Sequence, residues 1–173
     1  MSQGLNTMST LAAFIYTCKA AVAATLAILL CELFNLPWPV WAAVSALIVI
    51  QPSLHPSLRA SVVRVVANLI AAVVGSALHA LIGIQLVDLV LGIMAVGMIC
   101  HHTKLDDGLR AGYAAVAIVT LAMPDNTFEG AVYRVVAVVL GCLCAVLVNV
   151  VFDKLGTKEP VPPGEASGGG HGE

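Results

Sequence analysis

Six runs of hydrophobic residues, separated by short polar segments, fill most of the chain. A membrane-spanning helix needs about 20 mostly apolar residues. In chain order the six runs are Leu11–Phe34, Val40–Gln51, Ala60–Ile82, Gln85–Cys100, Ala111–Met123 and Ala131–Phe152. The first, third and sixth runs meet this length, the fourth nearly does, and the second and fifth are short. The pattern predicts an all-α protein with a helical region over 11–153. A short segment, 1–10, precedes it, and a polar Pro- and Gly-rich tail, 154–173, follows it and is expected to be disordered.

Two parts of the chain have closely similar sequences. WAAVSALIVIQP, which begins at Trp41, matches YAAVAIVTLAMP, which begins at Tyr113. After a short turn, RVVANLIA from Arg64 matches RVVAVVLG from Arg134. An internal repeat predicts repeated structural units. Because each unit holds three hydrophobic segments, we expect the second to be inverted in the membrane relative to the first, an arrangement typical of transporters. The two units are 11–82 and 85–153.

The composition places the helical region in a membrane. Hydrophobic residues make up 60% of the chain and charged residues 10%, with a mean hydropathy of +0.97, whereas soluble domains carry about 25% charged residues. The net charge of −2 provides no basic face for nucleic acid. The first hydrophobic run is longer than a signal-peptide core and no Lys or Arg precedes it, so we expect it to be a retained helix. The sequence therefore predicts an integral, multi-pass membrane protein.

The basic residues indicate whether the two short segments cross the membrane or only dip into it. If all six segments cross, seven basic residues share one side with both termini: Lys19, Arg59, Arg64, Lys104, Arg110, Lys154 and Lys158. Arg134 alone then lies opposite; re-entrant short segments divide the basic residues three against five. Cytoplasmic loops are enriched in Lys and Arg. We therefore predict six transmembrane helices with both termini in the cytoplasm, and we interpret Trp38 and Trp41 as anchors at the outer interface.

Small residues form matching stripes on the third and sixth predicted helices, and each stripe ends in a polar residue. The stripes are Ala67, Ala71, Gly75 and His79, and Ala137, Gly141, Ala145 and Asn149. We interpret the small residues as positions of close helix packing. Polar groups inside apolar spans usually face the bundle interior or a water-filled cavity. His79 and Asn149 are therefore candidates either for interhelical hydrogen bonds or for contact with a substrate or proton, whereas Asp88 is expected to be solvated at the outer mouth of the fourth helix.

Arg64 and Arg134 are the main candidates for ligand binding. Each is predicted about one turn inside a helix N-terminus, at opposite faces of the membrane. One interpretation is that both side chains snorkel to the headgroups. The other is that the helix dipole and a fixed guanidinium attract a carboxylate at each mouth of a pathway. Asn68, one turn beyond Arg64, extends this candidate site, and its counterpart in the second half is Val138.

Other kinds of chemistry are not indicated. Cys100, His101 and His102 lack the separated ligand pairs of a structural zinc site. The five cysteines lie in or beside apolar runs, without the spacing of a disulfide framework. No phosphate-binding loop, nucleophile elbow or zinc-protease motif is present. We therefore predict no metal, no cofactor and no enzymatic activity.

An aromatic-led short helix, a Q-P-S turn and an arginine-led helix together resemble the fusaric acid resistance protein-like family, within the aromatic acid exporter superfamily. The matching residues are Trp41, Gln51, Pro52, Ser53 and the run from Arg64 to Ala71, and the similarity covers residues 14–152. Ala67, Asn68 and Ala71 stand where the family tends to have Gly, Thr and Gly. The resemblance implies export of aromatic or other small organic acids across a bacterial inner membrane, driven by the proton gradient. Larger members carry two six-helix blocks, so a single block implies a homodimer or a partner membrane subunit.

The sequence is compatible with three hypotheses about function. The first is an exporter of small organic anions, because unusually short segments at matching places in two halves are typical of a transport site. The second is a passive anion channel, since plant malate channels are similar in helix organisation and acids inside the predicted spans are scarce. The third is a non-transporting membrane subunit of a larger complex, which the small-residue stripes allow.

Overall fold

The computed structural model describes residues 10–51, 53–122 and 127–155. These residues form six α-helices and one short 3₁₀ helix: α1 (Thr10–Leu33), α2 (Val40–Val49), α3 (Leu54–Leu81), α4 (Gln85–His102), η1 (Asp106–Gly108), α5 (Leu109–Ala122) and α6 (Thr127–Lys154). The prediction of an all-α protein with six helices is confirmed. The segment before Thr10 and the tail after Leu155, for which we predicted a cytoplasmic location, lie outside the described residues.

Four of these helices are long and apolar enough to cross a membrane, namely α1, α3, α4 and α6, whereas α2 and α5 are shorter apolar helices. α3 begins at Leu54, six residues before the predicted start, because Pro56 occupies the first turn of the helix, where proline is well tolerated. α3 and α6 each contain 28 residues and measure about 42 Å at the helical rise. Both are therefore longer than the hydrocarbon core of a bilayer, which is about 30 Å thick.

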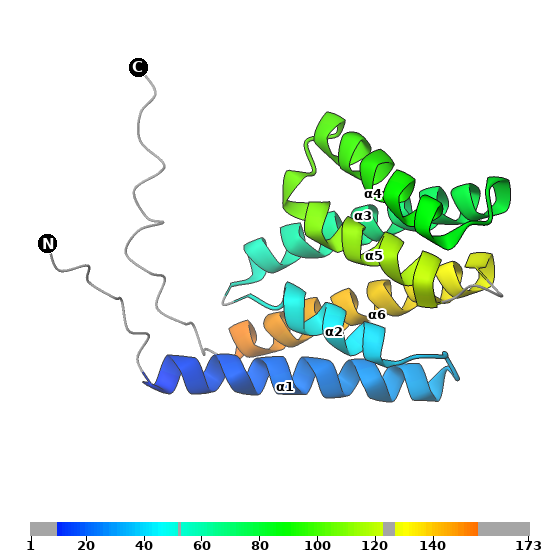
Figure 1. Cartoon of the computed structure of the whole chain (residues 1–173). Helices are drawn as coiled ribbons and strands as arrows, with labels where there is room; N and C mark the ends of the chain where they lie inside the picture. Colours follow the sequence, from blue (N-terminus) through cyan, green and yellow to red (C-terminus); the bar gives the residue numbers. More distant parts are fainter. Residues whose placement is uncertain (1–9, 52, 123–126, 156–173) are drawn as a thin grey trace, which may run out of the picture.

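The helices run alternately from one end of the bundle to the other, and the two short helices take part in this alternation (Figure 1). The start of α1, the α2–α3 turn, η1 and the end of α6 lie at one end, which we call the η1 end. The α1–α2 and α3–α4 turns lie at the opposite end. This arrangement is the one expected if all six segments cross a membrane.

The two halves of the chain exchange their third helices. α6 packs against α1 and α2 of the first half, α3 packs against α4 and α5 of the second half, and α3 and α6 pack against each other. The main hydrophobic core accordingly combines buried residues of α1, α2 and α6, and a second core combines those of α3, α4 and α5. If the labels α1, α2 and α3 are swapped with α4, α5 and α6, respectively, the list of contacting α-helix pairs stays the same. Neither half encloses a core by itself, so the halves are interlocked.

The small-residue stripes lie at these exchanged interfaces. A Cβ atom placed on Gly141 of α6 would overlap the carbonyl oxygen of Ala42 in α2, so the two helices touch at backbone distance. On α3, Gly75 faces Val119 of α5, and a Cβ there would lie 3.1 Å from the valine Cγ1. Ala67 on α3 similarly faces the close glycines Gly108 and Gly112. The small residues therefore allow α2 and α5 to approach the long helices closely, as in other membrane bundles.

Candidate functional site

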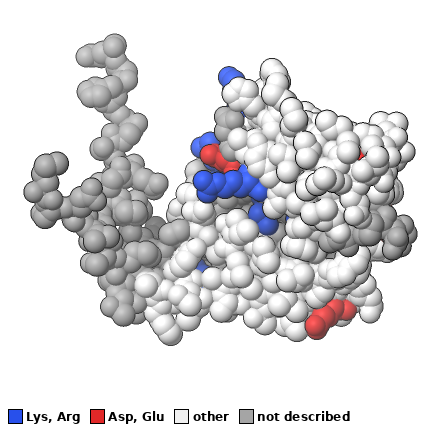
Figure 2. Space-filling view, viewed as in Figure 1, with Lys and Arg blue, Asp and Glu red and all other residues white. Residues whose placement is uncertain are grey.

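A cavity of about 370 Å³ lies between α2, α3 and the η1–α5 segment, at the η1 end of the bundle. Its polar lining residues are Gln51, Arg59, Arg64 and Asp107. The volume falls within the range of sites for small molecules. α2 and α5 make no contact with each other in the described part of the chain, which leaves this space open between them. Figure 2 shows Lys and Arg atoms gathered in a hollow near this end, with acidic atoms beside them, on a face that is otherwise nearly uncharged.

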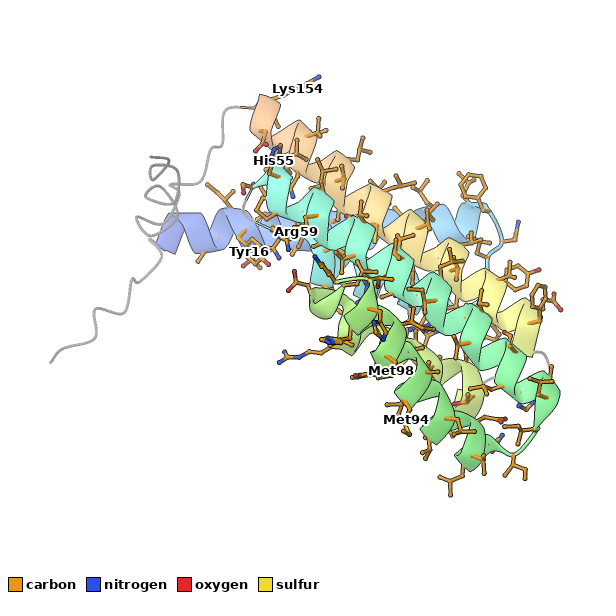
Figure 3. All side chains as sticks on the ribbon, turned by 90° about the horizontal axis from the view of Figure 1, so that it is seen from above. Tyr16, His55, Arg59, Met94, Met98 and Lys154 are labelled. Atoms are coloured by element: carbon orange, nitrogen blue, oxygen red, sulfur yellow. The ribbon has the colours of Figure 1, made fainter. Side chains whose placement is uncertain are left out.

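Arg59 and Asp107 form an ion pair beside the cavity. The Arg59 Nη2 atom lies 3.1 Å from the Asp107 Oδ2 atom, and both side chains are largely exposed. Figure 3 places Arg59, with His55 and Lys154, toward the same end of the bundle. Exposed ion pairs contribute at most about 1 kcal/mol. The pair therefore joins α3 to η1 weakly.

Arg64 lies much deeper in the bundle than the sequence predicted. It follows Leu54, the first residue of α3, by ten positions, or about 15 Å at the helical rise. The predicted position one turn inside the helix is therefore wrong, because α3 begins earlier than its apolar run. Only 9% of Arg64 is exposed, and its Nε has no hydrogen-bond partner among the described residues. A buried charge with an unpaired donor is costly, which makes Arg64 a candidate for anion binding.

Arg134 is also buried, in α6. It is 3% exposed, and its Nε and Nη1 atoms find no hydrogen-bond partner in the described structure. Its guanidinium carbon lies 4.3 Å from the centre of the Trp41 ring, a cation–π contact that stabilises a charge with little solvent access. Trp41 therefore holds Arg134 in place between α2 and α6, in addition to the anchoring role predicted from the sequence. Trp38 is 47% exposed.

The two arginines approach each other inside the bundle. The Asn149 side-chain amide donates a hydrogen bond to the Ser57 hydroxyl, and the Cys142 thiol contacts the Ser61 carbonyl oxygen. A later residue of α6 thus faces an earlier residue of α3, so the two helices run antiparallel. In this register Arg64 and Arg134 are separated by about 10 Å along the bundle axis, and their like charges repel each other. Arg64 is nearer the η1 end and Arg134 nearer the opposite end. They do not occupy two distant mouths, as predicted, but flank the middle of the bundle.

Two further polar side chains are buried in the bundle with an unpaired oxygen among the described residues, and neither lines the cavity. The Asn68 Nδ2 atom donates to the Arg64 carbonyl oxygen at 2.8 Å, which leaves its buried Oδ1 without a partner in the described residues. The hydroxyl of Ser45 in α2 is completely buried and likewise unpaired within them. Ser45 lies one helical turn after Trp41 and faces α6 near Gly141. The sequence indicated Asn68 but not Ser45, whose contacts depend on how α2 packs against α6.

His79 and Asn149 are not brought together with the arginines. His79 follows Arg64 by fifteen positions in α3, or about 22 Å at the helical rise, and its Nδ1 lies 3.0 Å from the Asp88 Oδ2 atom. Asp88 is completely buried, so the prediction of a solvated carboxylate is wrong. Asn149 donates to the Ser57 Oγ atom at 2.6 Å, and this oxygen also accepts a hydrogen bond from the Gln51 backbone N–H at 2.9 Å. Asn149 thus holds the α2–α3 turn against α6.

Comparison with known proteins adds a family relationship. The sequence model of a protein family described as aromatic acid exporter family member 1 matches residues 12–152. This match confirms the predicted resemblance. UPF0421 protein YgaE of Bacillus subtilis strain 168 is 31% identical over 136 residues, which are 78% of this chain and 38% of the relative. A UPF0421 protein of Bacillus cereus strain ATCC 10987 is 29% identical over 132 residues, 76% of this chain and 37% of the relative. The chain thus spans little more than a third of the length of these relatives. No solved structure matches it.

Proposed function

The chain belongs to the aromatic acid exporter family, and we propose that it is a membrane transporter that exports small organic anions, aromatic carboxylates among them. The observation that carries this proposal is the cavity that ends at Arg64. A planar guanidinium binds a carboxylate through two parallel hydrogen bonds. Arg64 offers such a group at the inner end of a cavity large enough for an aromatic acid. It has no competing carboxylate partner in the described structure.

The transport path proceeds from Arg59 to Arg64 and then to Arg134. Arg59 attracts the anion at the exposed mouth, where its weak pair with Asp107 opens easily. Arg64 then binds the carboxylate, with the unpaired Asn68 oxygen beside it to accept a hydrogen bond from a substrate hydroxyl. Arg134, about 10 Å further along the axis, takes the anion when the opposite side opens. The repulsion between the two arginines is relieved by an anion between them.

The membrane orientation follows from charge. Arg59, Lys104, Arg110 and Lys154 all belong to segments at the η1 end, and basic residues mark the cytoplasmic side. We therefore assign the η1 end and both termini to the cytoplasm of a bacterial inner membrane. The reciprocal packing of the halves supports an inverted repeat, in which export proceeds as the two halves exchange their arrangement around a central site. The cavity at Arg64 is then the inward-facing state.

Transport by the purified chain in liposomes tests this proposal. Radiolabelled 4-hydroxybenzoate should cross vesicles that contain the wild-type chain faster than it crosses empty vesicles. Arg64→Ala should reduce this flux to the level of empty vesicles. Arg110→Ala is the matched control, because it removes an exposed charge at the same end that does not line the cavity. Normal flux through Arg64→Ala would contradict the role of Arg64, and no flux through the wild type would contradict transport by this chain alone.

A passive anion channel is the second candidate. It is favoured by the scarcity of acids in the spans, where Asp88 is the only completely buried carboxylate among the described residues. A channel would carry a voltage-dependent anion current that needs no substrate on the opposite side of the membrane. A transporter would show saturable flux without measurable single-channel steps. We further propose that the chain acts as a homodimer or with a partner membrane subunit, and cross-linking in native membranes would identify that partner.

A further inference from the structure

The α3–α4 hairpin contains a buried acid–base pair that the anion pathway does not use. Asp88 lies in the first turn of α4 with no exposed surface, and its Oδ1 has no hydrogen-bond partner among the described residues. Its Oδ2 lies 3.0 Å from His79 Nδ1, and the His79 side chain is 23% exposed. A buried carboxylate in a membrane span is costly and generally functional. The pair therefore needs an explanation beyond helix packing.

We propose that His79 and Asp88 form a proton-binding site that couples the proton gradient to anion export. Without an added proton, an ionised Asp88 accepts the Nδ1–H of a neutral His79, and the pair has a net charge of −1. A proton from water then binds His79 Nε2, which gives an imidazolium–carboxylate pair with no net charge. One proton is taken up and no other bond changes. Proton uptake thus changes the charge of the pair by one unit at the contact between α3 and α4.

The neighbouring titratable groups leave the pair to act by itself. Of the helices that pack against α3 and α4, α2 carries no titratable residue, and the half of α5 nearest the pair carries none up to Leu121. On α6, the half that begins at this end carries Glu129, which is exposed, Tyr133, which is half-buried, and Arg134, which is buried against the Trp41 ring. Asp107 and Arg110 belong to η1 and the start of α5, at the η1 end of the bundle and therefore far from the pair. The charge of Asp88 is therefore balanced by His79 rather than by a network.

The location of the pair suits coupling between separate sites. His79 and Arg64 lie on one helix, about 22 Å apart by the helical rise, so a proton and an anion need not compete for the same space. A change in the charge of the pair alters how firmly α3 holds α4, because the two residues join these helices. α3 also carries Arg64 into the cavity. Movement of α3 upon proton binding would therefore reach the anion site directly.

Two modes of transport in liposomes test this proposal, which rests on the proposed function. Asp88→Asn keeps the side-chain size and an oxygen that accepts the His79 N–H, but it cannot hold a negative charge. Accumulation of radiolabelled 4-hydroxybenzoate driven by a pH gradient should fall at least ten-fold in this variant. Exchange of labelled for unlabelled probe at equal pH should stay within two-fold of the wild type. Glu129→Gln, which removes an exposed acid at the same end, should leave both rates unchanged. Wild-type accumulation by Asp88→Asn, or an equal loss of both modes, would overturn the proposal.

A titration separates failure of this site from failure of the transport function. If the wild-type chain shows no exchange, anion transport fails, and the pair is then tested in the full chain in lipid nanodiscs. Histidine side-chain nitrogen NMR, with His79→Gln to assign the signal, measures proton binding by His79. A neighbouring carboxylate stabilises the imidazolium, so Asp88→Asn should weaken proton binding by His79 at least ten-fold. An unchanged titration in Asp88→Asn would overturn the proton site whatever the transport result.

Discussion

Adding one methyl group at Gly141 should loosen the contact between α2 and α6. A Cβ at this position overlaps the Ala42 carbonyl oxygen and lies 3.0 Å from the Ser45 Cβ. The carbonyl belongs to the backbone of α2, so no side-chain rotation relieves the overlap, and α2 must move away by roughly 1 Å to restore ordinary van der Waals separation. Gly141→Ala therefore separates the helix that carries Ser45 and Trp41 from the helix that carries Arg134.

Two opposing effects set the size of the change. Replacing glycine by alanine inside a helix stabilises the helix by up to about 1 kcal/mol. Overpacking a close interface destabilises it by typically 1–3 kcal/mol, and the upper part of this range applies where backbone is struck. The net loss should be about 1–2 kcal/mol, which for a chain of this size lowers Tm by about 5 °C.

The buried cysteines provide the assay. Cys31, Cys100, Cys142 and Cys144 are buried and form no disulfide in the described structure, so a thiol-reactive fluorescent dye reports unfolding of the detergent-solubilised chain on heating. Gly75→Ala is the matched control, because its Cβ would meet only the movable side chain of Val119 at 3.1 Å. We expect a change in Tm of less than about 2 °C for Gly75→Ala. Equal Tm values for Gly141→Ala and the wild type would refute the close packing of α2 on α6.

Three further variants test local features with the same thermal assay, to which a measurement of 4-hydroxybenzoate affinity is added for Asn149. Asn149→Leu removes the hydrogen bond to Ser57 and should destabilise the chain by about 1–3 kcal/mol. The affinity for 4-hydroxybenzoate should stay unchanged. A ten-fold loss of affinity at normal stability would instead make Asn149 a ligand contact. Arg59→Ala breaks an exposed ion pair with Asp107 and should shift Tm by less than about 2 °C, whereas a larger fall would mean that this pair holds α3 to η1. Lys104 has a φ of 57°, and Lys104→Gly should raise stability by about 0.4–1 kcal/mol because glycine adopts this conformation freely; a lower Tm would contradict that backbone assignment.

Hydrophobic length and repetition were sufficient to predict the six helices. Apolar runs are long in a membrane protein, and the predicted bounds of α1, α2, α4 and α5 differ from the structure by two residues or fewer at each end. The start of α3 was predicted poorly because the polar residues Ser57 and Arg59 resemble a turn. In the structure they follow Pro56 within the helix. This difference of six residues moves Arg64 from the membrane surface to the bundle interior.

The tertiary features of the site could not be predicted from periodicity. His79 and Asp88 are nine residues apart and meet only because the chain reverses at Gly83, which has a φ of 71°. The cavity at Arg64 exists because the third helices are exchanged between the halves, which keeps α2 and α5 apart. Such an exchange leaves no trace in the spacing of apolar residues, since either pairing buries the same helix faces.

The affinity of the full chain for 4-hydroxybenzoate in lipid nanodiscs, measured by titration calorimetry, tests most directly whether Arg64 binds the anion. Hydrogen bonds to a charged group contribute about 1.5–3 kcal/mol, and 1.4 kcal/mol corresponds to a ten-fold change in Kd. Arg64→Met keeps the bulk of the side chain and removes its charge, so its Kd should be about 10- to 150-fold weaker than that of the wild type, while Arg110→Met should bind like the wild type. Equal affinities for the wild type and Arg64→Met would contradict the account.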